Sequence, residues 1–242
     1  MQTTSTEFLF KNKDSVPREF NKIAGRYDFA TALSQGYQDD LNRSARLLKL
    51  NGSELVLDLC CGTGKSTAAI LPAITTGKII AIDNSEGMLS VARQKFSKQI
   101  AQRKIELQLK DAMYLDFPDE SLDAVFMAYG LRNMPDYEKC VANLFRMLKS
   151  GGQLVIHDYS VQKSRYARLF WAVLGYGFIV PFCTVLSGSS TIYTYLIKSV
   201  LEFLSPDELS ALLEKKGFEK VSIQRHPSWR RPILHSFRAV KP

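Results

Sequence analysis

The sequence predicts an α/β fold with a mostly parallel sheet of seven strands, helices on both faces and one antiparallel strand. Two observations support this prediction. Short runs of β-branched and leucine residues recur along the chain, and most are followed by a segment with helical spacing of apolar residues. Such alternation favours parallel pairing with helices on both faces, and 242 residues suit one domain of this kind with an added cover.

The strands and helices can be placed along the chain. Strands are expected at residues 55–59, 78–82, 105–109, 122–128, 153–157, 221–224 and 234–240. Helices are expected at 66–74, 86–100, 137–148 and 206–216. Ser85 is a suitable N-cap for the second helix, and Ser205 with Glu208 has the spacing of a capping box at the start of the fourth.

Residues 163–203 interrupt this alternation and are expected to form an apolar helical cover above a ligand cleft. Residues 169–186 carry no charge, so this run is close to the length of a membrane span. Two glycines and Pro181 within it disfavour a true span. A buried pair of helices, or an apolar insert that admits a hydrophobic substrate, accounts for it better.

Composition excludes several classes of protein. Residues 1–14 are polar and contain no apolar stretch, so no signal peptide is expected. The four cysteines (Cys60, Cys61, Cys140 and Cys183) have neither CxxC nor metal-site spacing and are expected to be reduced, as in the cytoplasm. Three scattered histidines without an acidic cluster predict no metal site.

Most of the net positive charge lies near the C-terminus, where eight lysines and arginines from Lys215 onward accompany one acidic residue, Glu219. Such a cluster suits an anionic membrane surface or a phosphorylated substrate, or it is a solvated face. No aromatic platform or recognition helix accompanies it, so nucleic acid is not an expected partner.

A glycine turn follows the first strand. The strand contains Asp58 and leads into Gly62, Thr63 and Gly64, and the second strand is followed directly by Asp83. A glycine turn at the carboxyl end of a strand lets a small molecule approach the backbone, because no Cβ stands in the way. A carboxylate at the tip of the next strand can accept hydrogen bonds from both hydroxyls of a ribose.

The turn matches neither the GxGxxG pattern nor a Walker sequence. A dinucleotide pyrophosphate or a nucleoside triphosphate is therefore not the favoured ligand. An adenosine that carries an amino-acid tail fits better, which indicates S-adenosylmethionine.

Seven short runs carry a closer resemblance: 20–28, 58–64, 83–89, 111–112, 117–119, 129–133 and 146–152. Through them the chain resembles the class I S-adenosylmethionine methyltransferases, and more narrowly the ubiquinone/menaquinone biosynthesis C-methyltransferases, over most of residues 20–217. The Gly-Leu-Arg-Asn run at 130–133 discriminates best. Lys65 replaces a usual aspartate, the segment after Gly36 lacks an aromatic-basic helix start, and residues 227–233 replace a Gly-Gly segment. These departures leave the identity of the substrate open and do not affect the prediction of the cofactor.

The resemblance implies one Rossmann-like class I methyltransferase domain over residues 1–242. It would comprise an N-terminal lid (about 15–50), a cofactor-binding core (51–160), the apolar cover insert (161–204), and a C-terminal helix with two strands (205–242).

The expected cofactor-binding residues come partly from the turn and partly from the resemblance. They are Tyr27, Asp58, Gly62, Thr63, Gly64, Asp83, Asn84, Met88, Asp111, Ala112 and Ala128. The turn would hold the methionine tail and Asp83 the ribose. Met88 could lie against the adenine or simply pack in the core. The resemblance implies that Asp111 and the Ala112 amide read the adenine edge, and that Tyr27 closes over the cofactor.

Methylation of a ring carbon needs an ionised neighbouring phenol. Arg132 could stabilise that phenolate or hold a water that takes the proton, and Asn133 could orient either. A salt bridge and cap at a helix start is the alternative for this pair. His157, the last residue of the fifth predicted strand, could be a general base or a core histidine, and ranks second to Arg132.

The resemblance therefore implies S-adenosylmethionine-dependent C-methylation of a polyprenylated quinol, either demethylmenaquinol or a 2-methoxy-polyprenyl-benzoquinol. The enzyme would be cytoplasmic, would touch the inner membrane face where such a substrate resides, and could form a homodimer. Three alternatives stay open: another lipid or phenolic acceptor (a sterol, phosphatidylethanolamine or a small phenol), an inactive cofactor-binding scaffold, and a nucleic-acid methyltransferase.

Overall fold

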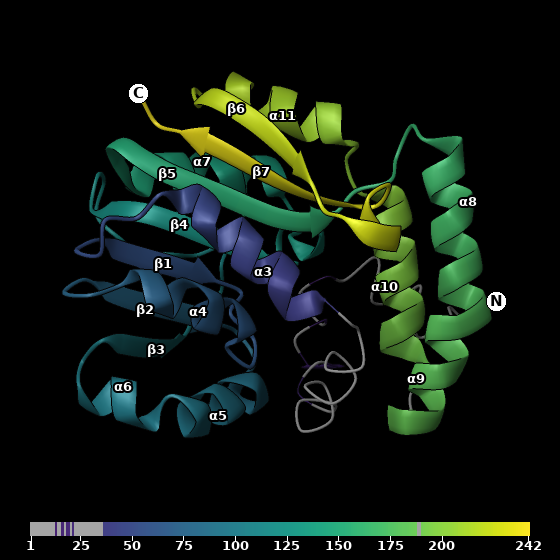
Figure 1. Ribbon diagram of the computed structural model, residues 1–242, viewed down its shortest axis with the longest axis horizontal. Helices are drawn as coiled ribbons and strands as arrows, with labels where there is room; N and C mark the ends of the chain where they lie inside the picture. The colour runs from purple at the N-terminus through teal and green to yellow at the C-terminus, as the bar shows by residue number, and fades with distance from the viewer. Residues whose placement is uncertain (1–12, 14–15, 17, 20, 22–35, 188–189) are drawn as a thin grey trace.

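The computed structural model describes residues 13, 16, 18–19, 21, 36–187 and 190–242, built around a seven-stranded sheet with the order β3-β2-β1-β4-β5-β7-β6 (Figure 1). The strands are β1 (Leu55–Leu59), β2 (Lys78–Asp83), β3 (Ile105–Leu109), β4 (Leu122–Ala128), β5 (Leu148–Tyr159), β6 (Glu219–Arg225) and β7 (Leu234–Val240). Strands β1 to β5 pair in parallel, and β7 runs antiparallel to both of its neighbours. The predicted mostly parallel sheet with one antiparallel strand is confirmed.

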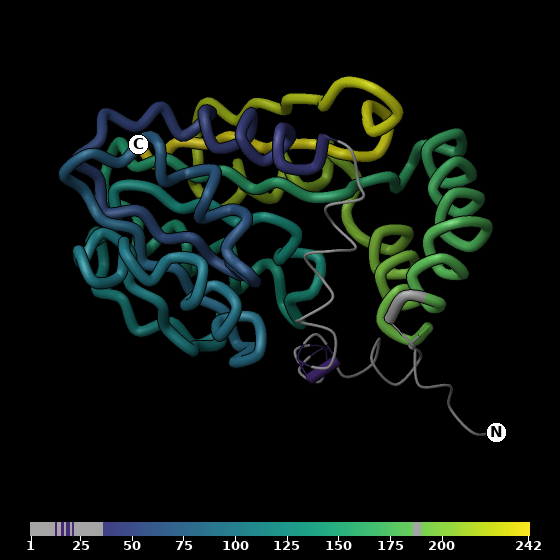
Figure 2. Tube along the Cα trace, turned by 60° about the horizontal axis from the view of Figure 1, so that its bottom comes forward, coloured from purple at the N-terminus to yellow at the C-terminus, as the bar shows by residue number. Residues whose placement is uncertain are grey.

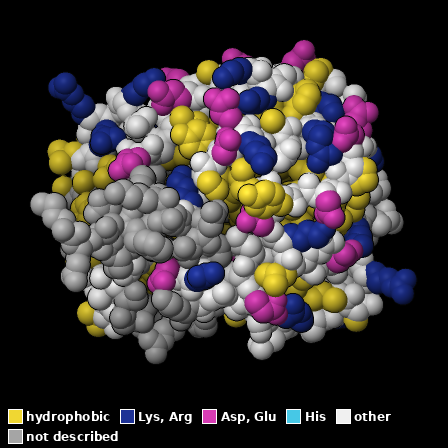
Figure 3. Space-filling view, turned by 180° about the vertical axis from the view of Figure 1, so that it is seen from behind, with side chains coloured by type: hydrophobic (Ala, Val, Ile, Leu, Met, Phe, Trp, Pro, Cys, Tyr) yellow, Lys and Arg dark blue, Asp and Glu magenta, His cyan; other side chains and the backbone are white. Residues whose placement is uncertain are grey.

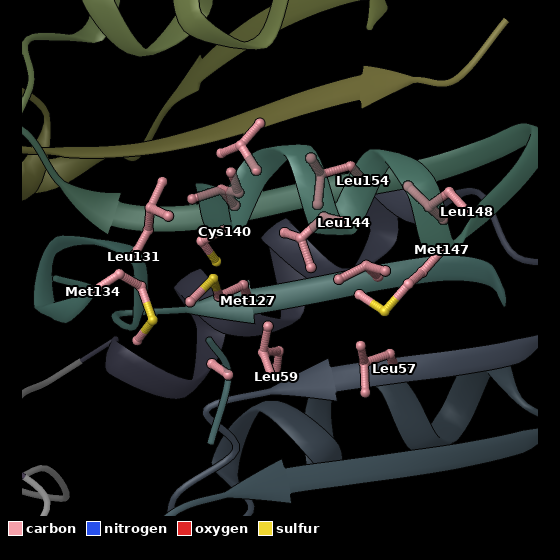
Figure 4. Packing of buried hydrophobic residues seen from close by; sticks show 14 of the residues in the cluster. Leu57, Leu59, Met127, Leu131, Met134, Cys140, Leu144, Met147, Leu148 and Leu154 are labelled. Carbon is pink, nitrogen blue, oxygen red and sulfur yellow. The ribbon is translucent and has the colours of Figure 1, made fainter. Parts of the chain in front are cut away.

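Helices cover both faces of the sheet, as the alternation predicts. On one face, α7 (Tyr137–Met147) and α11 (Pro206–Lys215) pack on Leu57, Val125 and Leu154, part of the cluster that Figure 4 shows. On the other face, α3 (Tyr37–Ala45), α4 (Lys65–Ile70) and α5 (Glu86–Lys95) pack on Val56 and Phe126. Neighbouring residues of a strand thus point to opposite faces, and both faces are buried, which explains why the strands read as nearly continuous apolar runs.

Several element ends differ from the predicted ones. Strand β5 begins at Leu148, five residues before the predicted start, and its pairing with β4 is irregular there, where Gly151 has φ 78°. Instead of one helix over 86–100 there are two, α5 and α6 (Ser97–Ala101), separated at Phe96, whose ring packs against Gly64. The predicted caps are confirmed: Ser85 accepts from the Met88 amide, and Ser205 with Glu208 forms a capping box.

The insert forms a helical unit beside the sheet. Helix α8 (Arg165–Leu174) continues through a π-helical turn (Gly175–Ile179) into α9 (Val180–Ser187), and α10 (Thr191–Glu202) lies between them and the sheet (Figures 1 and 2). Trp171 of α8 packs with Ile197 and Val200 of α10. The predicted apolar helical insert is thus present.

The expectation that the insert is a buried helix pair is correct for α10 and wrong for α8 and α9. Residues Arg165–Val185 form a 21-residue helical stretch that is long and apolar enough to cross a membrane by length and composition, and its most apolar 18-residue window has a mean hydropathy of 1.5. Only 11% of its most apolar window is buried. Because one face packs on α10, the opposite face is left open.

Candidate active site

A cavity opens at the carboxyl ends of β1, β2 and β4, where the glycine turn and Asp83 predict a ligand. Seven of the expected cofactor residues line it: Gly62, Thr63, Asp83, Asn84, Met88, Asp111 and Ala128. Asp58, Gly64 and Ala112 lie behind this lining, and Tyr27 lies outside the described residues. The topology thus brings together residues that are up to 66 positions apart in the chain, as expected where parallel strands end at one edge.

The two glycines of the turn serve different purposes. Gly62 has φ 55°, and a Cβ added there would meet no atom of the described residues within 4 Å, so its backbone borders the cavity without a side chain in the way. Gly64 has φ 81°, and a Cβ there would lie 2.4 Å from the Phe96 ring. Gly62 therefore leaves room for a ligand, whereas Gly64 lets the turn pack against Phe96.

Asp83 is held by two backbone donors. Its Oδ2 accepts from the Gly62 amide at 2.8 Å, and its Oδ1 accepts from the Ser85 amide at 2.9 Å. Burial raises the pKa of Asp83 to about 6, against the opposing effect of these hydrogen bonds. A carboxylate oxygen can accept more than one hydrogen bond, so both oxygens can still receive ribose hydroxyls.

Asp58 lies fully buried beneath the turn rather than at its surface. Its Oδ2 accepts from the hydroxyls of Ser66 (2.8 Å) and Thr67 (2.5 Å) at the start of α4, and burial raises its pKa to about 7. Its Oδ1 is also buried and has no hydrogen-bond partner among the described residues. This free acceptor beside the turn fits the ammonium group of an amino-acid tail, reached directly or through a water.

The adenine end of the expected ligand would lie between α5 and the segment after β3. Met88, buried and one turn into α5, lines the cavity, and so does Asp111, whose Oδ1 accepts from the Met113 amide at 2.8 Å. Together with the open backbone at Gly62, these groups fit an adenosine with an amino-acid tail.

Tyr129 is a cavity residue that the sequence reasoning missed. It follows β4 with φ 57°, an uncommon conformation for a bulky residue and one that often marks a functional site. Its ring stacks on Tyr37 (centroids 5.3 Å apart), and its hydroxyl lies 3.0 Å from Nε2 of His157. The available signal was its position as the first residue of the matching run 129–133.

Arg132 does not line the cavity. It is 5% exposed and pairs with the buried Asp158 at 2.5 Å, and its Nη1 also donates to the Tyr129 carbonyl at 2.9 Å. Burial raises the pKa of Asp158, and the Arg132 charge opposes that effect. This is the salt-bridge arrangement that the sequence left open as the alternative.

Asn133 does line the cavity. Its Nδ2 donates to the Tyr129 carbonyl at 3.2 Å, and its Oδ1 accepts from the Tyr195 hydroxyl of α10, also at 3.2 Å. Among the described residues, none of 163–203 lines the cavity, and a cover directly above the cleft stays a prediction. The insert adjoins the cavity rim through Tyr195.

His157 is fully buried, and both ring nitrogens have partners. Nδ1 lies 2.9 Å from Ser236 Oγ, and Nε2 lies 3.0 Å from the Tyr129 hydroxyl. Burial lowers its pKa well below the ordinary value for histidine. A direct general-base role does not fit this placement, because Tyr129 stands between His157 and the cavity.

Much of the C-terminal basic cluster is engaged within the fold. Lys215 and Lys216 pair with Glu138, Arg230 pairs with Asp40, and the buried Lys241 donates to the Leu148 carbonyl. The face seen in Figure 3 likewise mixes acidic and basic side chains. The cluster therefore does not form a single basic surface.

A family model described as the ubiE/COQ5 methyltransferase family matches residues 9–231 of this chain. A demethylmenaquinone methyltransferase from Lactococcus lactis subsp. lactis is 36% identical over 225 residues, which cover 89% of this chain and 86% of the relative.

Solved structures share the fold at low sequence identity. The [4+2]-cyclase SpnF superposes with a TM-score of 0.71 at 15% identity, covering 94% of this chain and 95% of the cyclase. An S-adenosylmethionine-dependent methyltransferase from Thermotoga maritima, described as a possible histamine N-methyltransferase, gives 0.66 at 19% identity, covering 94% and 100% of the two chains. The differing activities of these two proteins show that this fold does not by itself specify a substrate.

Proposed function

Because the chain belongs to the ubiE/COQ5 methyltransferase family, and is thus an S-adenosylmethionine-dependent methyltransferase, we propose that it methylates a ring carbon of a polyprenylated quinol. Demethylmenaquinol is the first candidate acceptor, since the Lactococcus relative is named for it. A 2-methoxy-polyprenyl-benzoquinol is the second, from the family resemblance. The observation that most supports the proposal is this 36% identity over 89% of the chain, joined to a cavity lined by the expected residues.

On the cofactor side, the residues would act by position. S-adenosylmethionine supplies an electrophilic methyl group on a sulfonium. The open backbone at Gly62 and the unpartnered Oδ1 of Asp58 would hold the amino-acid tail, Asp83 the ribose, and Met88 with Asp111 the adenine. Methyl transfer is an in-line displacement, so alignment of the acceptor carbon with the methyl group is the main requirement.

On the acceptor side, we assign contact with the quinol to Asn133 and Tyr129, which line the cavity beyond the turn. Arg132 would act behind them. Its Nη1 donates a hydrogen bond to the Tyr129 carbonyl, which also accepts one from Asn133 Nδ2. Its charge is paired with Asp158. Arg132 is therefore proposed as a positioning residue, and Asn133 as the group that orients the ring hydroxyl.

Cofactor affinity is expected to fall in acid as Asp83 takes up a proton. Only the ionised carboxylate can accept from both ribose hydroxyls, and the pKa of Asp83 is raised to about 6. Affinity should be highest above pH 8, where Asp58 (pKa raised to about 7) is ionised as well, and the loss of the Asp83 charge should weaken it by up to tenfold per pH unit below pH 6. Isothermal titration with S-adenosylhomocysteine between pH 5 and 8 measures this. Asp83→Asn should bind more weakly with a flatter profile, whereas an unchanged profile would contradict the role of the carboxylate.

We also propose that the enzyme is cytoplasmic and works at the inner membrane face, since a polyprenyl tail keeps its substrate in the bilayer. The exposed apolar residues of α8 and α9 support contact with such a surface. They are also compatible with a homodimer, which analytical ultracentrifugation without lipid would detect.

The acceptor is tested by single-turnover transfer of labelled methyl to a panel. The panel holds demethylmenaquinol, a 2-methoxy-polyprenyl-benzoquinol, phosphatidylethanolamine, a sterol, a small phenol and RNA. We expect label in a quinol. Label in another acceptor would leave the cofactor assignment intact and replace the substrate assignment. Cofactor binding without any methyl transfer would favour an inactive scaffold.

A further inference from the structure

The outer side of α8 and α9 carries an unusual amount of exposed apolar surface. We define the α8–α9 face as Leu169, Val173, Tyr176, Phe178, Phe182 and Val185, which are 41–85% exposed. These are six of the eleven exposed large apolar residues in the described part of the chain. Three more, Tyr166, Ile223 and Trp229, line a neighbouring hollow between α8 and β6–β7. Contiguous exposure of this kind indicates an interaction surface.

The helix that presents this face is firmly attached to the domain. On its inner side, Trp171 is 1% exposed, and its ring nitrogen donates to the Ile197 carbonyl of α10 at 3.2 Å. A row of rings then leads from Trp171 through Tyr159 to Tyr129 at the cavity, with centroids 4.8 and 5.3 Å apart. The face is therefore a rigid surface connected to the active site.

Basic side chains outnumber acidic ones around the face, although Glu202 lies close enough to Tyr176 to act on its hydroxyl. Between Asp158 and Glu202 the sequence contains no acidic residue but four basic ones, three of which (Lys163, Arg165 and Arg168) lie at the start of α8. The hollow adds Arg225 and Arg231, both exposed and without a carboxylate partner among the described residues. It also contains Asp207, while Lys163 pairs with Glu208. An apolar face bordered by bases and amphipathic aromatics is typical of helices that lie in a membrane interface.

We propose that the α8–α9 face docks onto an anionic phospholipid bilayer, lying in its interface, with lipid phosphates received by Arg225 and Arg231 in the hollow. A second copy of the chain is a poorer occupant, because a two-fold contact through this face would bring the same basic residues together. The inference deepens the proposed function by naming the docking surface. It does not depend on the quinol, since binding can be measured without substrate.

Co-sedimentation with vesicles tests the docking surface. The wild-type chain should bind vesicles of phosphatidylglycerol and phosphatidylcholine better than phosphatidylcholine alone. Leu169→Glu/Val173→Glu/Phe178→Glu should abolish binding to both. Arg225→Ser/Arg231→Ser should bind the anionic vesicles about 25-fold more weakly, since each basic side chain near such a surface raises the affinity roughly fivefold.

The matched control is Leu109→Glu/Tyr114→Glu, which changes exposed apolar residues outside the α8–α9 face and the hollow. It should bind like wild type. The proposal would be overturned if the control lost vesicle binding equally, or if the wild-type chain bound no vesicles. It would also be overturned if the wild-type chain formed a dimer without lipid and the glutamate variant were monomeric. Because binding needs no methyl transfer, these outcomes leave the proposed function to be judged separately.

A second inference comes from a chain of hydrogen bonds behind Tyr129. The Tyr129 hydroxyl lies 3.0 Å from His157 Nε2, and His157 Nδ1 lies 2.9 Å from Ser236 Oγ. Ser236 Oγ lies 2.7 Å from His226 Nε2, and His226 Nδ1 lies 3.1 Å from Asp40 Oδ1. With one tautomer of each histidine, every group donates once toward Asp40 and accepts once from the cavity side.

We infer that this chain is a proton relay that ionises the acceptor, an inference that rests on the proposed function. The ring hydroxyl gives its proton to Tyr129 Oη as the Tyr129 proton passes to His157. One proton shifts at each following link, and His226 ends as an imidazolium paired with the Asp40 carboxylate, which Arg230 also pairs with. After the C–CH₃ bond forms, the ring C–H proton leaves to water, and the stored proton returns to the oxygen. One proton is released overall.

Ser236→Ala breaks the relay at a site that is fully buried and does not line the cavity. We expect single-turnover methyl transfer to slow by at least about tenfold, within the range for positioned acid–base groups. Affinity for S-adenosylhomocysteine should stay unchanged, and the solvent deuterium isotope effect should change. Ser199→Ala, at another buried serine that donates to the Leu196 carbonyl, is the control and should behave like wild type.

Tyr129→Phe keeps the stacked ring but removes the hydroxyl, and should slow transfer at least as much as Ser236→Ala. Transfer that is fast in both variants, with the wild-type isotope effect, would overturn the relay while leaving the methyltransferase activity established. Failure of the wild-type chain to methylate any quinol would instead contradict the proposed function.

Discussion

Asp83→Ala should weaken binding of S-adenosylmethionine by at least about 100-fold, the largest effect expected from a single change in the cofactor site. Two hydroxyl hydrogen bonds to a carboxylate contribute roughly 1.5–3 kcal/mol each. The change would also remove the hydrogen bonds that the Gly62 and Ser85 amides donate to Asp83. The turn around the ligand would then be less well fixed. Isothermal titration at pH 8, where the wild-type carboxylate is ionised, measures the loss.

Asp123→Ala is the matched control for this experiment. Asp123 also accepts from a backbone amide, that of Leu55 at 2.8 Å, but it does not line the cavity. Its loss should leave cofactor affinity unchanged. If both variants bound the cofactor alike, Asp83 would not be the ribose acceptor.

Arg132→Met should lower the free energy of unfolding by about 3–5 kcal/mol, because it leaves the buried Asp158 without its partner. The double variant Arg132→Met/Asp158→Leu should recover much of that loss, since it removes both charges. Chemical denaturation of the three proteins at one pH measures both effects.

Arg146→Met is the control for Arg132→Met. Arg146 pairs with Asp119, but both side chains are partly or largely exposed, so its loss should cost under about 1 kcal/mol. An Arg132 variant as stable as the Arg146 variant would contradict the structural role of the buried pair. Loss of methyl transfer in a stable Arg132→Met/Asp158→Leu protein would show that the arginine also acts on the reaction.

The parts of the site that the sequence predicted are those set by local chemistry. A strand that ends in a glycine turn, and a second strand that ends at Asp83, specify backbone geometry and charge within a few residues. Parallel pairing then brings the two strand ends to one edge of the sheet. For the same reason, the caps at Ser85 and Ser205 could be read from residues three positions apart.

The parts that the sequence did not predict depend on partners far along the chain. Arg132 and Asp158 are 26 residues apart in sequence. They form a pair because the neighbouring strands β4 and β5 bring the segments around them together. His157 is enclosed by Tyr129 on one side and Ser236 of β7 on the other, which no local pattern indicates. The apolar run in α8 and α9 could not show which face packs on α10 and which stays exposed.

The central claim is that methyl is placed on a ring carbon of a quinol. The most direct test is to incubate the enzyme with demethylmenaquinol and ¹³C-methyl S-adenosylmethionine and locate the label in the product by NMR. We expect a carbon-bound methyl group on the quinone ring. A methyl group on oxygen, or an unlabelled quinol under conditions where S-adenosylmethionine binds, would contradict it.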